Sequence, residues 1–261
     1  MLKITGYSDR VSARPGETIK FMVNCELGQY RADIVKLICG DSSPDGPDFK
    51  EKLIRTPANK RYKGRKQKIY AGSYGIVESN PALEGLKSFT AQAMIWPTTP
   101  ERGQQAILGK WNERSKSGFA MVIAEDGSLG LMLGNGKGKA QTVSTGKAMI
   151  ARHWYMVAAS WDAEKKEVRL YQEAMREYVG VKHSGTARKK IKLARVANNS
   201  APLTIAALYE KNAGKRVVCS DFYNGKIDGP RISDRVLSRA EIEALKGNSI
   251  PRALATTVLA A

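Results

Sequence analysis

The sequence predicts an all-β protein built as a sandwich of two sheets. Most of the chain consists of short apolar runs separated by turn residues. Two of these runs are joined by Asp126-Gly127, a dipeptide that favours a tight turn between antiparallel strands. Almost no stretch has the spacing of apolar residues that an amphipathic helix requires. Short strands at regular spacing, with few helices, are typical of sandwiches and barrels.

The first 80 residues are predicted to form a β segment that ends in a basic connector. Pro15-Gly16 indicates a turn, after which the apolar residues of IKFMVN alternate with more polar ones. The stretch ADIVKLICG, at 32–40, is a second apolar run rich in β-branched residues. Residues 40–50 have the composition of a loop. The stretch RTPANKRYKGRKQK, at 55–68, is strongly basic and has no period, so a solvated loop or connector is expected there.

Residues 81–247 are predicted to hold the sandwich. In SFTAQAMIW, Phe89, Ala91 and Ala93 lie on the same face of a strand because successive strand side chains point to opposite faces. Further strands and hairpins are predicted in FAMVIAEDGSLGLML, HWYMVAASWDAEKKEVRLYQ, PLTIAALY, KRVVCSDF and GKIDGPRI. This pattern predicts successive antiparallel strands over most of the chain.

One short helix is predicted near the C-terminal end of the sequence. Ser238 and Glu241 form a capping box, in which each side chain accepts a hydrogen bond from the other residue's backbone N–H. Ile242 and Leu245 give the helix an apolar side, and Gly247 ends it. We expect this helix to close one edge of the sandwich. Residues 248–261 have no cap or polar tail, and we expect a linker into a further C-terminal domain.

Composition and charge limit the class of protein. No apolar run approaches the roughly 20 residues that cross a bilayer, and the first ten residues lack the apolar core of a secretory signal. Cys25, Cys39 and Cys219 are an odd and sparse set, which favours a reducing compartment. We therefore expect a cytoplasmic protein with no membrane partner. The net charge of +18 is unusual and suggests an acidic partner.

Four stretches, taken in order, resemble successive strands of the laminin-G-like, concanavalin-A-like jelly-roll family. They are SFTAQAMIWPTTP, QAILGKWNERSKSGFAMVIAEDGSLGLMLG, HWYMVAASWDAEKKEVRLYQ and FYNGKIDGPRISDRVLSRAEI. Each stretch alone is a weak signal, but their common order is a strong one. The resemblance covers roughly residues 81–247 and implies an antiparallel jelly-roll sandwich.

Three further stretches carry a second resemblance: ITGYSDRVSARPGETIKFMVNCE, YRADIVKLICGD and AGSYGIVESNPALEGLKSFTAQAMIWPTTP. They resemble the N-terminal part of the large (beta) subunit of the N,N-dimethylformamidase family, which hydrolyses N,N-dimethylformamide to dimethylamine and formate. The resemblance implies a hetero-oligomeric amide hydrolase whose mononuclear iron lies in a domain C-terminal to the matched region. The implied partners are that catalytic domain and a small subunit. The family's large subunit is much longer than this sequence, which lacks the metal-bearing part.

The residues of this sequence show no catalytic or metal site of their own. Glycosidases with the jelly-roll fold carry carboxylates at alternating positions of one strand, and no such pattern occurs here. Glu164 and Glu167 flank a lysine pair in a predicted turn, and we interpret them as turn residues and not as a catalytic pair. His153 and His183 are the only histidines, and neither has another ligand at metal-binding spacing. We expect no catalytic residue, no metal ligand and no cofactor in this chain.

Two other loop motifs have simple structural explanations. Asp126 and Asp162 are better explained as turn formers than as calcium ligands. The stretch GNGKGK, at 134–139, does not match the phosphate-binding Walker pattern, and we predict a flexible hairpin loop.

The basic runs KRYKGRKQK, at 60–68, and ARKKIKLAR, at 187–195, carry much of the excess charge. The first interpretation is a positive surface that docks an acidic subunit or domain. The second is a solvated loop, and the third is nucleic-acid binding, in which Tyr62 and Tyr70 would stack on bases. The residues predicted to dock a partner are Arg61, Lys63, Arg65, Lys66, Lys68, Arg188, Lys189, Lys190 and Lys192.

The sequence therefore predicts a non-catalytic scaffold and subunit-contact domain of an amide hydrolase. One alternative is a free-standing carbohydrate-binding module. That function needs exposed aromatic side chains, and of the candidates Trp96, Trp111, Trp154 and Trp161, two lie in apolar strand context. The other alternative is a basic nucleic-acid-binding protein, and the sequence contains no nucleic-acid-binding motif that would favour it.

Overall fold

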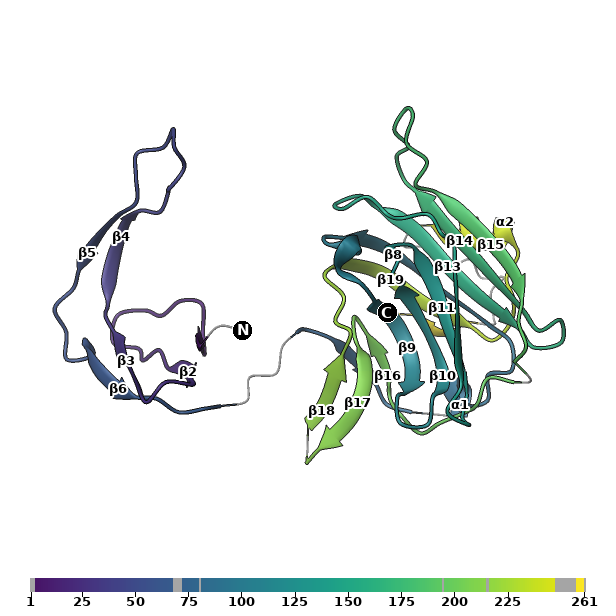
Figure 1. Cartoon of the computed structure of the whole chain (residues 1–261), viewed down its shortest axis with the longest axis horizontal. Coiled ribbons are helices and arrows are strands. Elements are labelled where there is room, and N and C mark those ends of the chain that lie inside the picture. Colours follow the sequence, from purple (N-terminus) through teal and green to yellow (C-terminus); the bar gives the residue numbers. More distant parts are fainter. Residues whose placement is uncertain are drawn as a thin grey trace. The chain divides into compact units, whose positions relative to one another are not determined.

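The computed structural model describes residues 3–67, 72–79, 81–193, 195–214, 216–246 and 257–260. The chain divides into two compact units, Met1–Ala71 and Gly72–Ala261. Each unit is built from antiparallel β-strands, and each is described by itself below (Figure 1).

The N-terminal unit consists of three two-stranded antiparallel pairs (Figure 1). The pairs are β1 (Ile4–Ser8) with β2 (Phe21–Cys25), β3 (Gln29–Ala32) with β6 (Lys60–Lys63), and β4 (Val35–Cys39) with β5 (Lys50–Leu53). The turn predicted at Pro15-Gly16 lies between β1 and β2.

One prediction for this unit is wrong. The basic stretch 55–68 is not simply a loop, because residues 60–63 form β6. Their backbone groups pair with β3, and the N–H of Gly64 continues the pairing by donating to the carbonyl of Gly28, at 2.8 Å. A side chain at Gly64 is excluded, since its Cβ would overlap the carbonyl oxygen of Leu27. Paired backbone therefore gives this charged stretch a defined conformation.

The second unit is an antiparallel sandwich of two sheets, as predicted, and each sheet has six strands. One sheet has the order β12-β11-β10-β9-β16-β7, and the other has the order β15-β14-β13-β8-β19-β20. The strands of the first sheet are β7 (Gly75–Val77), β9 (Gln105–Asn112), β10 (Ser117–Ile123), β11 (Leu129–Asn135), β12 (Ala140–Ser144) and β16 (Leu203–Ile205). Those of the second are β8 (Phe89–Pro97), β13 (Tyr155–Asp162), β14 (Glu167–Ala174), β15 (Gly185–Lys190), β19 (Gly225–Ser233) and β20 (Thr257–Ala260).

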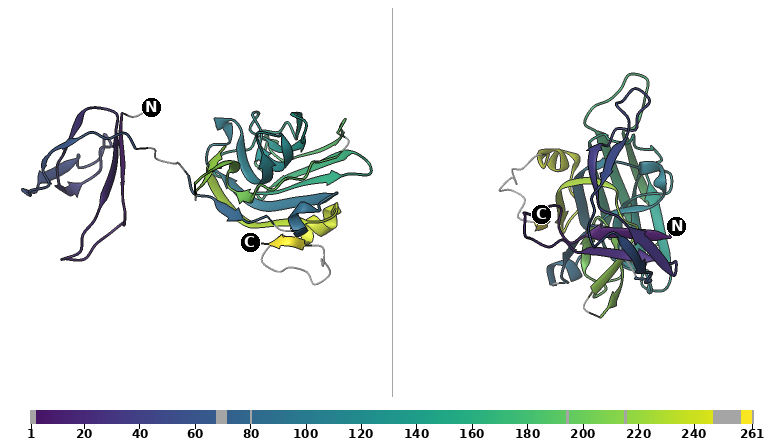
Figure 2. Two further views of the ribbon diagram at one scale, coloured as in Figure 1. Left: turned by 90° about the horizontal axis from the view of Figure 1, so that it is seen from below. Right: turned by 90° about the vertical axis from the view of Figure 1, so that its left-hand side faces the viewer.

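Four smaller elements complete the described part of this unit. They are α1 (Pro81–Glu84), a 3-10 turn η1 (Pro100–Arg102), the hairpin β17 (Leu208–Ala213) and β18 (Arg216–Ser220), and α2 (Arg239–Ala244). Figure 2 shows further views of the sheets and α2. No helix in the described ranges is long and apolar enough to span a membrane.

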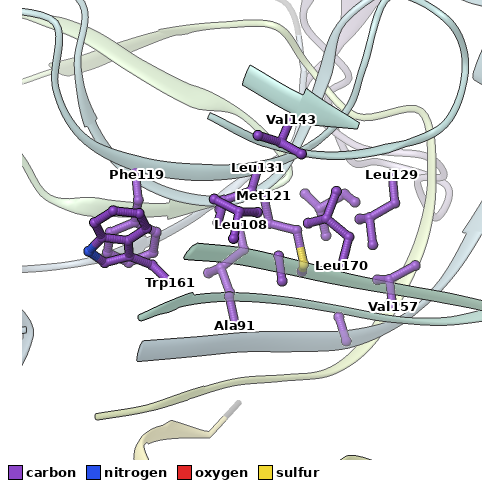
Figure 3. Packing of buried hydrophobic residues seen from close by; sticks show 14 of the residues in the cluster. Ala91, Leu108, Phe119, Met121, Leu129, Leu131, Val143, Val157, Trp161 and Leu170 are labelled. Atoms are coloured by element: carbon purple, nitrogen blue, oxygen red, sulfur yellow. The ribbon is translucent and has the colours of Figure 1, made fainter. Parts of the chain in front are cut away.

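Side chains from both sheets meet in one core. Figure 3 shows Leu108, Phe119 and Met121 of one sheet lying against Ala91 and Trp161 of the other. Phe89 of β8 also belongs to this core, and its ring centroid lies 4.2 Å from that of Phe119. The predicted inward face of β8 is therefore confirmed, because alternation places it against the opposite sheet.

The predicted hairpins and late strands are present, with two differences. Strands β10–β11 and β13–β14 pair as predicted. The run PLTIAALY is not one strand, because Ala206 has a left-handed φ of 67° and separates β16 from β17. Residues 75–77, predicted with the N-terminal segment, form β7 and pair with β16 of the sandwich. Distant pairing, rather than local composition, assigns them to the second unit.

The predicted capping box is present at the start of α2, with Ser238 accepting from the N–H of Glu241 and Glu241 accepting from that of Ser238. The prediction that this helix closes an edge of the sandwich is wrong, because α2 packs on a sheet face instead. Its buried residues Ile242 and Leu245 pack in a cluster with Tyr171, on the face of β13 and β14 that points away from the main core. The residue predicted to end the helix, Gly247, lies outside the described residues.

The C-terminal segment differs from the predicted linker where it is described. Thr257–Ala260 form β20, which pairs with β19 at the edge of its sheet. Residues 247–256 and 261 lie outside the described ranges. Backbone pairing with β19 explains why these four residues form a strand.

Candidate functional site

The N-terminal unit exposes hydrophobic side chains to an unusual degree. Cys25 is the only buried hydrophobic residue among residues 3–67. Of 18 large hydrophobic side chains that are exposed in the described chain, 12 belong to this unit, and Phe21, Leu37 and Phe49 are each more than half exposed. An isolated two-stranded pair is marginally stable in water at best. This number of exposed apolar side chains makes the unit a candidate for an interaction surface.

A groove of about 790 Å³ lies on this unit, and we call it the basic groove. Its lining comes from β2 and the residue before it, and from β3, β6 and the segment that follows β6. The lining residues are Lys20, Phe21, Met22, Val23, Tyr30, Tyr62, Lys63, Gly64, Arg65 and Gln67. A groove that combines apolar and cationic side chains is suited to a ligand with both apolar and anionic groups.

Hydrogen bonds after β6 hold the two sides of the groove together. The N–H of Cys25 donates to the carbonyl of Arg65, at 3.1 Å. The backbone N–H of Gln67 donates to Oδ1 of Asn24 at 2.7 Å, and its side-chain amide donates to the carbonyl of Val23 at 2.8 Å. These contacts hold the segment that carries Arg65 beside β2, although Arg65 and Cys25 are 40 positions apart in the sequence.

The aromatic side chains of the groove contact one another. Tyr30 and Tyr62 are partners across β3 and β6, and their rings stack with centroids 5.6 Å apart. The ammonium of Lys60 lies 5.2 Å from the ring centroid of Tyr62, and the Tyr62 hydroxyl donates to the carbonyl of Ala58. Stacking on Tyr30 and contact with Lys60 occupy the ring of Tyr62. The Tyr62 ring is therefore a poor platform for a nucleic-acid base, and Tyr70 lies outside the described residues.

The predicted docking residues of the first run have different surroundings. Lys63 and Arg65 line the groove, and neither they nor Lys20 form an ion pair with any residue that the structure describes. Lys66 is paired with Glu26 at 3.7 Å. Arg61 lies opposite Arg31 across the β3–β6 pair. Lys68 lies outside the described residues.

The second run lies in the other unit, on the edge strand β15 and the residues after it. The Nε of Arg188 lies 2.9 Å from the buried carboxylate of Glu167, which also accepts from Arg169 at 2.8 Å. Lys189, Lys190 and Lys192 are exposed and have no ion pair within the described chain. Charged side chains on an edge strand block pairing with other chains. That structural role explains this run without a partner.

The carboxylates considered for catalysis are in structural positions. The hydrogen bonds from Arg188 and then Arg169 hold the pKa of Glu167 below its ordinary value, which suits an ion pair and not a general acid. Asp126 accepts hydrogen bonds from the N–H and hydroxyl of Ser128, as a turn former does. The stretch 134–139 ends β11 and forms the loop before β12, as predicted.

The structure brings the two histidines together, which the sequence did not predict. Their ring centroids are 6.2 Å apart, and His183 is almost fully buried. The Nδ1 of His183 lies 2.7 Å from the hydroxyl of the buried Tyr155, and its Nε2 lies 3.5 Å from Glu177. Burial raises the pKa of Tyr155 to about 12. Within the described ranges, no group of three or more His, Cys, Asp or Glu residues is arranged to hold a metal ion.

The tryptophans do not form an aromatic platform. Trp111 and Trp161 are buried, at 1% and 0% exposure. The ring of Trp96 is covered by the ammonium of Lys226, at 4.9 Å from the centroid. Of the four tryptophans, only Trp154 is an exposed residue, with 36% of its surface accessible. This arrangement does not favour a carbohydrate site built on these four residues.

Comparison with known proteins places these features in context. The family model of the concanavalin A-like lectin/glucanases superfamily matches residues 71–243. Two curated relatives, from Alcaligenes sp. and Paracoccus aminophilus, are both named N,N-dimethylformamidase beta subunit. They are 33% and 32% identical over 96% and 95% of this chain. The chain covers 34% of each, so it spans about a third of their length.

Solved structures are similar to this chain in fold. The CBM40 of the Ruminococcus gnavus IT-sialidase, bound to α2,3-sialyllactose, has a TM-score of 0.53 and 19% identity, covering 69% of this chain and 95% of that one. A putative carbohydrate-binding protein from Bacteroides ovatus has a TM-score of 0.50 and 17% identity, covering 82% and 58%. At these identities the likeness shows the sandwich fold alone.

Proposed function

The chain belongs to the concanavalin A-like lectin/glucanases superfamily, and we propose that it is a non-catalytic scaffold and subunit-contact domain of an amide hydrolase. The enzyme would be of the N,N-dimethylformamidase type, after the name of the curated relatives. Its partners would be a C-terminal catalytic domain and a small subunit. The free thiols of Cys25, Cys39 and Cys219 suit a cytoplasmic assembly.

The observation that carries this proposal is the exposed apolar surface of the N-terminal unit. Burial of apolar side chains is the main favourable contribution to folding, and among residues 3–67 only Cys25 is a buried hydrophobic residue. A partner that covers the exposed side chains would supply the missing burial. The excess positive charge beside this surface would speed the encounter with an acidic partner.

The iron of the resembled family does not fit the described residues of this chain. No cluster of three or more His, Cys, Asp or Glu side chains suits an ion there, and the two histidines interact with tyrosines and Glu177. We therefore propose that iron chemistry belongs to another part of the enzyme.

Two matched variants test the contact role. Arg61, Lys63 and Arg65 are replaced by serine in one variant, and Lys189, Lys190 and Lys192 in the other. Both variants lose the same charge, and both leave the paired Arg188 intact. We expect association with the companion subunit, measured by stopped-flow fluorescence at low salt, to slow by about tenfold in the first variant only.

An activity assay is the second test. The purified chain should not hydrolyse N,N-dimethylformamide above background, with or without added iron, whereas the assembled enzyme should. Turnover by the chain alone, or failure to associate with any companion subunit, would overturn the proposal. Equal slowing in both variants would assign the effect to net charge and would remove the special role of the first run.

A further inference from the structure

We propose that the basic groove of the N-terminal unit binds an extended acidic segment of a different protein chain, in which carboxylates alternate with apolar side chains. This inference rests on the proposed function, because it names the partner chemistry of the same contact unit. Three properties of the groove support it: its apolar wall, its unpaired cations and its size.

The apolar wall comes mainly from β2. Phe21 lines the groove while 64% exposed, and Met22 and Val23 beside it are only half-buried. A partner that covers Phe21 would gain binding free energy, because an aromatic side chain buries a large apolar area.

The cations give the groove its preference for acidic groups. Lys20, Lys63 and Arg65 line it, all three are exposed, and no described carboxylate pairs with them. Among the described lining residues none is acidic. The planar guanidinium of Arg65 suits two-pronged binding of a carboxylate, and each lysine supplies a point charge. A neutral apolar segment would leave these charges without partners.

The size of the groove favours a short segment over a folded surface. Its volume of about 790 Å³ lies within the range of roughly 300–1,000 Å³ that is usual for ligand pockets. Such a volume admits a few side chains of an extended peptide. The backbone of the segment would run past the groove while alternate side chains enter it.

Charge and ring contacts argue against the two main rivals. A second copy of this chain carries the same net charge of +18 and would be repelled. A single-stranded nucleic acid stacks successive bases on several aromatic rings, whereas Tyr30 stacks on Tyr62 and Lys60 lies near the same ring, which leaves only Phe21 open among the aromatic lining residues. The groove therefore matches an acidic peptide better than either.

Fluorescence anisotropy with defined probes tests the proposal on the full chain. The probes are a labelled short peptide of alternating glutamate and leucine, matched peptides of glutamate–serine and lysine–leucine, and an oligothymidine. We expect the glutamate–leucine peptide to bind at least tenfold more tightly than the other three. Phe21→Ala should weaken its binding about tenfold, whereas Phe49→Ala, at an exposed phenylalanine outside the groove, should not.

Two variants that each remove one lysine charge separate an effect on binding from an effect on folding. Lys63→Gln should weaken binding of the glutamate–leucine peptide and make it less sensitive to salt, whereas Lys36→Gln, at another exposed strand lysine, should leave it unchanged. In the assembled enzyme, a carbodiimide that joins amines to touching carboxylates should link Lys20 or Lys63 to a different chain.

The outcomes separate the inference from the function on which it rests. Tighter binding of oligothymidine, or equal binding of the glutamate–serine peptide, overturns the inference. Cross-links from Lys20 or Lys63 to a second copy of this chain overturn it as well. If the enzyme assembles but the groove variants bind every probe as the wild type does, the groove inference is refuted and the proposed function stands. A chain that never joins an assembly refutes the proposed function.

Discussion

Replacing Leu245 by alanine should destabilise the sandwich unit, because this side chain fixes α2 to the sheet. Leu245 is 2% exposed and packs in a cluster with Ile242 and Tyr171. The helix end is also held by side chains from the sheet, since Arg231 donates to the carbonyl of Leu245 at 2.9 Å and Gln92 donates to that of Ile242 at 3.0 Å.

The magnitude follows from the cavity that the substitution leaves. Leucine-to-alanine changes in a core cost about 2–5 kcal/mol, and the larger values occur where the structure does not relax. The cluster beneath α2 is small, with six buried residues, and a short helix can move toward the sheet. We therefore expect a loss of about 3 kcal/mol. For a unit of this size, that loss corresponds to about 6–12 °C in Tm.

Tryptophan fluorescence measures this effect cleanly. All four tryptophans lie in the sandwich unit, so denaturant titration followed by fluorescence reports its unfolding and not that of the N-terminal unit. The control is Val179→Ala, at a fully exposed position in the same unit, which should change the free energy of unfolding by less than about 0.5 kcal/mol. If Leu245→Ala matches this control, α2 does not pack on the sheet in solution and the reasoning fails.

Three further predictions concern pH, thiols and the sheet edge. Hydrogen bonds from Arg235 and then from Ser238 lower the pKa of Glu241 from 4.5 to about 2. The stability that ionised Glu241 contributes is therefore complete above pH 4.5 and is lost as the pH falls toward 2. Glu241→Gln should make the free energy of unfolding less dependent on pH over that window, and an unchanged slope would contradict the ion pair with Arg235. Burial raises the pKa of Cys219 to about 11, so a thiol reagent at pH 8 should label Cys39 first in the folded chain, and equal rates would disprove the burial. Lys189→Val should increase light scattering on heating, because it removes a charge from the edge strand; unchanged scattering would mean that this charge does not protect the edge.

The sequence by itself determined the two central hairpins, β10–β11 and β13–β14, and which side of β8 faces the core. The alternation of Phe89 and Ala91 with Thr90 and Gln92 is a local property of extended backbone, so it is visible without a structure. The capping box was visible for the same reason, since its two residues are three positions apart. The resemblances to the jelly-roll and dimethylformamidase families were also carried by contiguous stretches.

Only the tertiary structure shows that the polar face of β8 is buried. Thr90 and Gln92 are 1% and 3% exposed, although their alternation predicts an outward face. The Thr90 hydroxyl donates to the carbonyl of Arg235 and accepts from the N–H of Leu237, while the amide of Gln92 reaches α2. These partners lie some 145 residues or more away, so no local pattern reveals that the face is covered.

The basic groove shows the same division. Charge alone selected Lys63 and Arg65, and both line the groove, but Arg61 and Lys66 from the same run do not. The place of Phe21 in the groove was missed, because its alternation with polar neighbours predicts an ordinary strand residue. Spacing fixes the face on which a side chain lies, since backbone geometry is local. Whether that face is buried, open or lined with charge depends on which distant segment folds against it, and that is decided by pairing across the whole chain.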